Sequence, residues 1–248
     1  MKYNKQLITK FIERYNLNGT IEAAQITSDG KNFYTLFKNV PGNLRGEIKL
    51  EKINLPEGEI GIYYTQTLLK MMSILDNDID VKYLGKRKED NSIINIEMSD
   101  TKGKKITHVA SILSLIDNDG KKGLIKDYDV KIKLNQETIQ DILKAFGAIN
   151  SSLDAQTIAF EKRDDKLFAI FGHSDTNSDI IEFELDAYYL DDDFDELMKF
   201  AAPGIKEILA VNGKFFEEAT LEISVKGALR LYFKDGDITS EYWIKKNN

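Results

Sequence analysis

The sequence predicts an α+β fold of two similar domains in tandem, each with two helices and antiparallel sheets. Three observations lead to this prediction. Residues 61–98 and residues 130–171 both read in the order strand, helix, strand, turn, strand. The helix in each segment carries apolar residues at helical spacing. The following strands alternate apolar and polar residues around short polar turns, which is typical of antiparallel hairpins.

The composition is that of an ordinary globular chain. It has 248 residues, of which 42% are hydrophobic and 30% charged, and its net charge is −7. No apolar run approaches the roughly 18 residues that a membrane-spanning helix needs, and the first residues lack the apolar core of a secretion signal. The chain has no cysteine, so a disulfide framework and thiolate chemistry are excluded. We therefore expect a cytoplasmic protein with no membrane partner.

The two helices of the repeated segment each have one apolar stripe, as expected when one face packs on a sheet. Thr65 and Asn135 can cap the helix starts through their side-chain oxygens. A third strand closes each copy, at residues 106–113 and 179–187. The stripe residues are Leu68, Leu69, Met72 and Leu75 in one copy, and Ile139, Ile142, Leu143 and Phe146 in the other.

The two ends of the chain contain two further copies of this pattern. Residues 4–15 predict an amphipathic helix, and a short helix is expected at 205–211. The segment 191–202 has no counterpart, and we expect an extra helical turn with acidic residues at its start. The apolar face of the first helix is Leu7, Ile8, Phe11, Ile12 and Tyr15, and strands are expected at 20–27, 32–38, 44–53, 220–225, 229–234 and 239–244.

A polar, glycine-bearing stretch at residues 117–123 divides the halves. The expected domains are 1–117 and 128–248, joined by a connector at 118–127. The alternative is an α+β protein in which the patterns recur by coincidence.

Signatures of enzymes and metal sites are absent from the sequence. Neither His108 nor His173 has another ligand at helical spacing, so no zinc helix is encoded. Asp117 and Asp119 begin a calcium-loop pattern that lacks its later ligands, and the acidic run 191–193 is better explained as a solvated segment. We expect no catalytic residue, no metal and no cofactor.

Basic residues gather on the polar sides of the predicted helices. Lys2, Lys10 and Arg14 form a ridge with Gln6 at four-residue spacing. The other helical segments contribute Lys70, Lys144, Lys199 and Lys206. If the helices share one side of the sheets, these cations form a positive surface that holds duplex DNA without reading its bases.

The chain resembles a DNA sliding clamp of the proliferating-cell-nuclear-antigen (PCNA) type, most closely the processivity factors of tailed phages. The resemblance covers essentially the full length and depends on the order and spacing of the whole set of elements. It is carried by the tandem halves, by NQETIQDILKAFGAI and TIAFEKRDDKLFAIFG in the second half, and by the C-terminal ATLEISVKGALRLYFKDGDITSEYWIKK.

The resemblance implies a homotrimeric ring around duplex DNA, loaded by a separate clamp-loader ATPase, in the host cytoplasm if the chain is viral. It places Lys5, Lys10, Arg14, Lys70, Lys144 and Lys206 toward the DNA. Subunits would join by strand pairing between about residues 106–113 and about 179–185 of the next copy, through Val109, Ile112, Ile180, Ile181 and Phe183.

The same resemblance implies a hydrophobic pocket that receives short peptides of DNA polymerase and other replication proteins. Its matching residues are Val40, Leu124, Ile125, Leu231, Tyr232, Trp243 and Ile244. Three rival interpretations stay open: a monomeric clamp-fold protein that binds DNA by charge alone, an enzyme on a tandem α+β scaffold, and a non-catalytic assembly protein.

Overall fold

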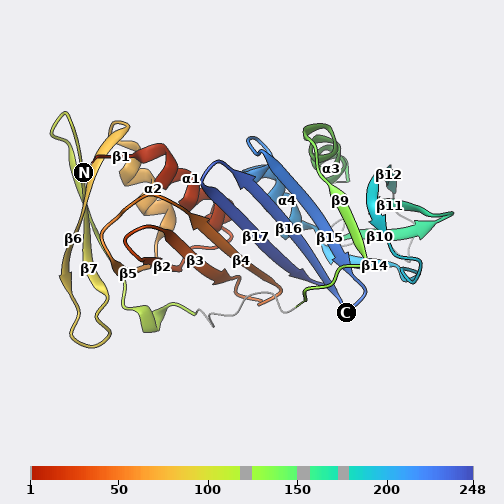
Figure 1. Ribbon diagram of the computed structural model, residues 1–248, viewed down its shortest axis with the longest axis horizontal. Coiled ribbons are helices and arrows are strands. Elements are labelled where there is room, and N and C mark those ends of the chain that lie inside the picture. Colours follow the sequence, from red (N-terminus) through yellow and green to blue (C-terminus); the bar gives the residue numbers. More distant parts are fainter. Residues whose placement is uncertain (1, 118–124, 150–156, 173–178, 248) are drawn as a thin grey trace. The chain divides into compact units, whose positions relative to one another are not determined.

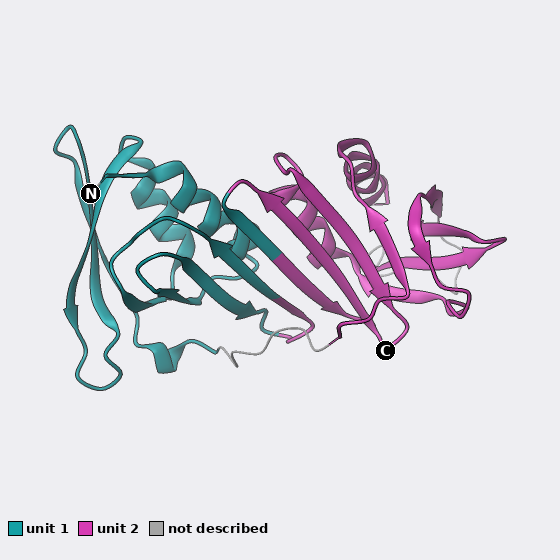
Figure 2. Cartoon of the chain, in the orientation of Figure 1, with its two compact units in different colours: residues 1–40, 46–122, 237–240 teal, residues 41–45, 123–236, 241–248 magenta. Residues whose placement is uncertain are grey.

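The chain folds into two compact units of antiparallel sheet and helix. The structure is a computed structural model that describes residues 2–117, 125–149, 157–172 and 179–247. Unit 1 contains residues 1–40, 46–122 and 237–240, and unit 2 contains residues 41–45, 123–236 and 241–248 (Figure 2). Each unit therefore takes a short segment from the other half of the chain. Residues 118–124 of the expected connector lie outside the described residues, as does His173.

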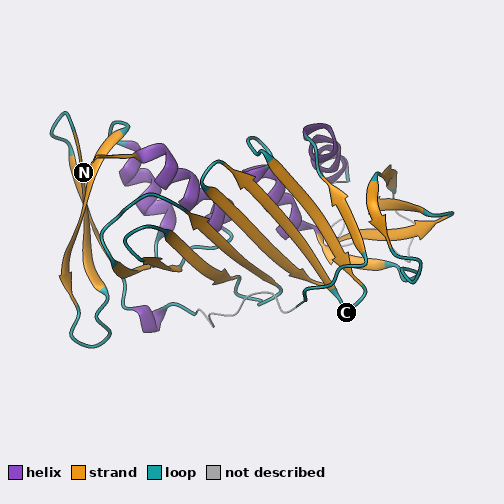
Figure 3. Cartoon of the chain, in the orientation of Figure 1, coloured by secondary structure: helices purple, strands orange, loops and turns teal. Residues whose placement is uncertain are grey.

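Unit 1 has two helices, α1 (Lys5–Asn16) and α2 (Thr65–Ser73), which pack against each other (Figures 1 and 3). One of its sheets has the strand order β1-β6-β7-β8, and a second run of strands has the order β4-β3-β2-β5. The strands are β1 (Lys2–Asn4), β2 (Ala24–Ser28), β3 (Phe33–Lys38), β4 (Leu44–Leu50), β5 (Gly58–Ile62), β6 (Asp78–Lys86), β7 (Ile93–Asp100) and β8 (Lys105–Val109), and 3-10 turns lie at Leu17–Gly19 and Leu113–Leu115.

Unit 2 repeats this plan with α3 (Gln136–Ala148) packed against α4 (Ala202–Asn212). Its strand orders are β12-β11-β10-β14 and β13-β9-β15-β16-β17. The strands are β9 (Val130–Lys133), β10 (Thr157–Arg163), β11 (Lys166–Phe171), β12 (Ile181–Leu185), β13 (Ala187–Leu190), β14 (Met198–Ala201), β15 (Glu218–Ser224), β16 (Ala228–Asp235) and β17 (Ile238–Lys245).

The strand before each helix pairs with the sheet of the neighbouring copy. In unit 1, β1 pairs with β6 and β5 pairs with β2. In unit 2, β9 pairs with β15 and β14 pairs with β10. This exchange satisfies the backbone groups of each short strand with a partner distant in sequence. Two copies of the repeat consequently fold together as one unit, and the predicted α+β fold class is confirmed.

The apolar stripes of the helices form most of the cores, but Leu69 and Leu143 are only half-buried and Leu7 is exposed. Ile8, Phe11, Ile12 and Tyr15 are buried as the helical spacing predicts, but Leu7 is 37% exposed. In a helix, residues three and four apart share a face, and Leu7 lies at the margin of that face.

Hydrogen-bonded polar groups join the end of α1 to the start of α2. They show that the predicted capping role of Thr65 was wrong. Thr65 does not cap α2 with its own side chain, because the N-cap position is Tyr64. Instead the Thr65 hydroxyl is buried, donates to the carbonyl of Glu22 at 2.8 Å and lies 3.1 Å from the Tyr15 hydroxyl. Asn135 does cap α3, since its Oδ1 accepts the Thr138 N–H at 2.8 Å.

The segment 191–202 differs from the extra helical turn expected there. It contains strand β14, which pairs with β10 through Phe200 and Ile158. Helix α4 begins directly after it, at Ala202, with Pro203 in its first turn, where a missing N–H costs no helical hydrogen bond. The predicted start at Ile205 was therefore too late. No described helix combines the length and the apolar character that crossing a membrane would require.

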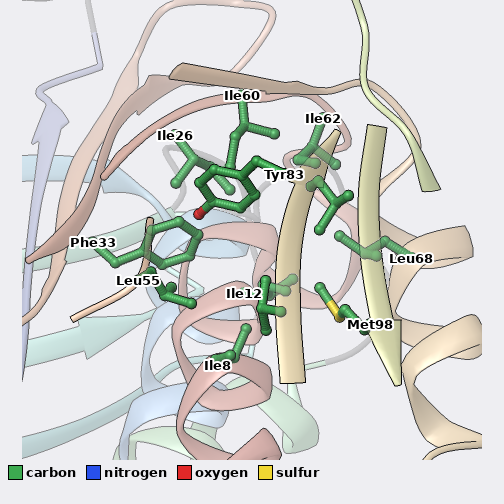
Figure 4. Close-up of a pocket in the computed structure, with 12 residues that line it drawn as sticks. Ile8, Ile12, Ile26, Phe33, Leu55, Ile60, Ile62, Leu68, Tyr83 and Met98 are labelled. Carbon is green, nitrogen blue, oxygen red and sulfur yellow. The ribbon is translucent and has the colours of Figure 1, made fainter. Parts of the chain in front are cut away.

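A small cavity of about 20 Å³ lies in the core of unit 1 (Figure 4). Apolar side chains from both helices and from strands on either side line it, among them Ile12, Leu68 and Met98, and Tyr83 also reaches it. This volume accommodates about one water molecule, so the cavity is a packing space of the core and not a ligand site.

Candidate nucleic-acid and partner surfaces

A groove between α1 and α2 brings together two of the predicted DNA-binding lysines. Lys5 and Lys10 line it with polar neighbours, and its volume is about 480 Å³. The Lys5 ammonium donates to the carbonyl of Leu75, near the end of α2. Lys70 is exposed on α2. Unit 1 thus presents three cations on its helices.

Arg14 differs from these three lysines, because it is buried while they are half-buried or exposed. Its side chain is only 4% exposed, and its guanidinium donates to the hydroxyl of Ser240 at 3.4 Å. The four-residue spacing from Lys10 correctly predicted a neighbouring position on the helix, but the sheet segment that contributes Ser240 covers it. Arg14 is a buried structural residue, and its predicted contact with DNA is not supported by this position.

Unit 2 contributes exposed lysines from both of its helices. Lys144 on α3 forms an ion pair with Asp141 at 3.0 Å, and both side chains are largely exposed. Such a surface pair contributes little to stability, so a phosphate can replace Asp141 at small cost. Lys206 is exposed on α4. Lys199 is half-buried on strand β14 and not on a helix, which separates it from this set.

The two strands that were predicted to form subunit contacts, β8 and β12, lie at the edges of their sheets. Among the described residues β8 pairs only with β7 and β12 pairs only with β11, so each is a terminal strand of its sheet. Val109, Ile112 and Ile180 are respectively 68%, 43% and 53% exposed beside these edges. Exposed edge strands present unpaired backbone groups and invite pairing with another chain.

The other two residues that were predicted to form the subunit interface are partly buried within unit 2. Ile181 and Phe183 are half-buried on β12. The ring of Phe183 stacks on that of Phe171, with centroids 5.5 Å apart.

His108 is a buried titratable group on the edge strand β8. Its side chain is 8% exposed, and its Nε2 has no hydrogen-bond partner among the described residues. Burial lowers the pKa of His108 below its usual value of 6.5, because the charged imidazolium loses its hydration.

Because His108 is buried, we expect the folded protein to become less stable as the pH falls. The unfolded chain binds a proton to His108 more readily than the folded chain does, so protonation favours unfolding. The contribution is complete above the unfolded pKa of 6.5 and is lost as the pH falls toward the lower folded pKa. Urea unfolding between about pH 7.5 and about pH 5.5 should show a steeper loss of stability for the natural chain than for His108→Gln. Equal slopes would contradict a buried, unpartnered histidine.

The residues predicted to form the peptide pocket divide into buried and accessible sets. Leu231 and Ile244 are 0% and 2% exposed and belong to the core of unit 2, so they cannot contact a peptide directly. Alternation along β16 and β17 turns Tyr232 and Trp243 to the opposite face, where both are partly exposed. Ile125 is also partly exposed, and Leu124 lies outside the described residues.

The same face of unit 2 carries a rigid charged cluster. Arg230 lies 2.7 Å from Glu222 and 3.2 Å from Glu241, and its guanidinium lies 5.5 Å from the centre of the Tyr232 ring. These contacts hold Tyr232 in position. Tyr232 and Trp243 are thus partly exposed aromatic groups on the same face of unit 2, and Arg230 contacts the ring of Tyr232.

Val40 lines a separate hollow in unit 1 that the sequence did not predict. The hollow has a volume of about 650 Å³ and is also lined by Tyr63, Tyr64 and Leu115. The exposed fractions are 100% for Val40, 42% for Tyr63, 65% for Tyr64 and 63% for Leu115. The two adjacent tyrosines before α2 are the sequence feature that could have indicated this hollow. The sequence alone does not show that they lie beside the 3-10 turn at Leu113–Leu115.

Solved structures with the same fold cover the whole chain. A crystal structure of PCNA from Entamoeba histolytica superposes with a TM-score of 0.75 and 16% identity, covering 100% of this chain and 98% of that one. The fold is that of a PCNA-type clamp. A structure of the C-terminal region of FEN-1 bound to A. fulgidus PCNA matches with a TM-score of 0.75, 14% identity and the same coverage. No protein-family model and no curated protein sequence matches the chain.

Proposed function

We propose that this chain is a DNA sliding clamp, a processivity factor that encircles duplex DNA and tethers DNA polymerase to it. The observation that carries the proposal is the combination of a clamp fold with exposed lysines on its helices and with edges of β8 and β12 that pair with no further strand among the described residues. In this role the protein is a scaffold and performs no catalysis. Three copies close the ring, a clamp-loader ATPase opens it, and the chain is most similar in this role to the processivity factors of tailed phages.

The ring forms when β8 of one copy pairs with β12 of the next. Each strand supplies an unpaired edge and neighbouring exposed apolar side chains, including Val109 and Ile180. Because each copy has one edge of each kind, the contact is head-to-tail and closes into a ring when the rotation permits. A closed ring stays on DNA without tight contacts, so a chain of net charge −7 can hold a polyanion.

Charge reversal of the exposed helix lysines should reduce DNA binding while the fold is retained. The variant Lys70→Glu, Lys144→Glu, Lys206→Glu is expected to weaken binding to a plasmid-length duplex by about 10-fold or more and to flatten its salt dependence, because lysine–phosphate contacts release counterions. The measurement is fluorescence anisotropy over a salt series, with circular dichroism to verify folding.

The matched control is Lys88→Glu, Lys226→Glu, Lys234→Glu, which makes the same change in net charge at exposed positions outside the helices. DNA binding of this control should fall much less than that of the helix variant. Equal losses in both variants would show that overall charge, and not the helix face, governs binding, and the DNA-binding assignment would be rejected.

Partner proteins bind through short peptides at the aromatic surfaces of the two units. Peptide sites with few contacts depend on aromatic anchors, which makes Tyr232 and Trp243 in unit 2, and the hollow at Val40 in unit 1, the places to test.

Trp243→Ala should reduce polymerase affinity by about 10-fold or more, since removing a large aromatic contact commonly costs 2 kcal/mol or more. Surface plasmon resonance with the polymerase that the clamp stimulates gives the measurement. Phe215→Ala, at another exposed aromatic residue of unit 2, is the control and should bind normally. Normal polymerase binding by Trp243→Ala would exclude this surface as the docking site.

A further inference from the structure

Strand β13 leaves a second open edge in unit 2, apart from β12. Among the described residues it pairs with β9 and is the first strand of its sheet order. The N–H of Asp191 donates to the carbonyl of Asp129 on the β9 side at 2.8 Å. Backbone groups alternate in direction along an antiparallel strand, so the N–H and carbonyl of Leu190 point away from β9. This edge is able to accept another strand.

Two adjacent tyrosines are exposed on this edge. Tyr188 is 62% and Tyr189 is 44% exposed. In a regular strand their side chains would point to opposite faces, but the register shifts between Ala187 and Tyr189, which identifies a bulge at Tyr188. The bulge leaves both rings accessible beside the unpaired backbone.

Most of the charged residues around these rings are acidic, although Lys131 and Arg230 also lie nearby. Residues 186–197 contain six carboxylates and no lysine or arginine. Glu222 and Glu218 add to the burial that raises the pKa of the Tyr188 hydroxyl. Asp191 accepts a hydrogen bond from the Tyr189 hydroxyl at 2.9 Å, which raises the pKa of that hydroxyl. The nearby cation Lys162 is already held by Asp192 and Asp165.

The Tyr189 ring already contacts a cation in the structure. The ammonium of Lys131 lies 5.5 Å from its centre. An aromatic ring attracts an ammonium group through its electron-rich face, and the surrounding carboxylates strengthen that attraction. The chemistry of this edge therefore suits lysine and arginine side chains and repels phosphate.

We propose that the β13 edge binds an extended, lysine- or arginine-bearing segment of a partner protein by strand addition. The partner's backbone pairs with Leu190, and its cationic side chains lie over Tyr188 and Tyr189 and against the acidic residues. Strand addition supplies affinity through main-chain bonds, and alternate side chains supply selectivity. This docking site requires only β13 and its charges, so it stands whether or not the chain encircles DNA.

The probe is a fluorescein-labelled peptide of four Val-Lys repeats, with four Val-Glu repeats as the acidic control. Anisotropy with the full chain is expected to show saturable binding of the lysine peptide with a dissociation constant below about 1 mM, and no binding of the glutamate peptide. The double variant Tyr188→Ser, Tyr189→Ser should weaken binding by about 10-fold or more. Phe215→Ser, which removes an exposed aromatic residue elsewhere in unit 2, should have no effect.

Hydrogen exchange on the natural chain gives an independent measurement that needs no variant. The lysine peptide should slow exchange at the Leu190 amide, because that N–H becomes hydrogen-bonded to the added strand. Absence of binding, binding without protection at Leu190, or full binding by the double tyrosine variant would each overturn the proposal. A duplex DNA probe whose binding is lost in the same variant would assign the edge to nucleic acid and would overturn it as well.

Discussion

The Thr107→Pro variant is expected to sediment as a single chain at concentrations where we expect the natural protein to have a mass near three chains. Thr107 lies on β8 and is exposed. The N–H of Ala110 donates to the carbonyl of Ile94 on β7, and the N–H of Asp100 donates to the carbonyl of Lys104. The even-numbered residues of β8 therefore bond to β7, and alternation turns the N–H of Thr107 to the open edge.

Proline at this position removes the outward N–H without removing a hydrogen bond inside the subunit. Edge strands tolerate proline where the lost N–H faces solvent. In the ring the same N–H would bond to β12 of the next copy. Its loss, with the added bulk of the proline ring, should cost about 2–3 kcal/mol per contact, or about 30- to 150-fold in the association constant.

Two controls make this result specific. Thr107→Val keeps the N–H and should remain trimeric in analytical ultracentrifugation. The thermal unfolding of Thr107→Pro should stay within a few degrees of the natural chain at dilutions where both are monomeric. A natural chain that is monomeric at every concentration would favour the rival interpretation, a clamp-fold protein that binds DNA by charge alone. A trimer that Thr107→Pro leaves intact would move the contact away from β8.

The Arg14→Ala variant should lose about 2–3 kcal/mol of unfolding free energy. The guanidinium is buried and hydrogen-bonded, and removing it leaves the buried Ser240 hydroxyl without that donor. For a chain of this size the midpoint of thermal unfolding should fall by about 5–10 °C. Differential scanning fluorimetry and urea unfolding measure both quantities.

Lys144→Ala is the matched control, since it also removes one cation from a helix but at an exposed position. Its stability should change by less than about 0.5 kcal/mol. If Arg14→Ala kept full stability and bound DNA more weakly, Arg14 would face the DNA as its spacing suggested. The opposite pattern, unstable but with normal DNA affinity per folded molecule, is the expected one.

The sequence determined the local structure of this protein. Apolar residues three and four apart predicted the helices, as Ile8, Phe11 and Ile12 show, and polar turns between alternating runs predicted the hairpins. These patterns involve residues that are close together in the chain, so they can be recognised in the sequence alone. The four copies of the repeat could be recognised for the same reason, because each copy has its helix and strands in the same order along the chain.

Only the tertiary structure decided which surface residues remain at the surface. Lys10 and Arg14 are equivalent in spacing, yet Arg14 is covered by a segment more than 200 residues later in the chain. Alternation places Leu231 and Tyr232 on opposite faces of β16, but only the packing of the sheet decides that the face of Leu231 is the buried one. The exchanged strands, the hollow at Tyr63 and the open edge at β13 likewise depend on contacts between distant segments. Burial at these positions depends on contacts between distant segments, which the spacing of neighbouring residues does not show.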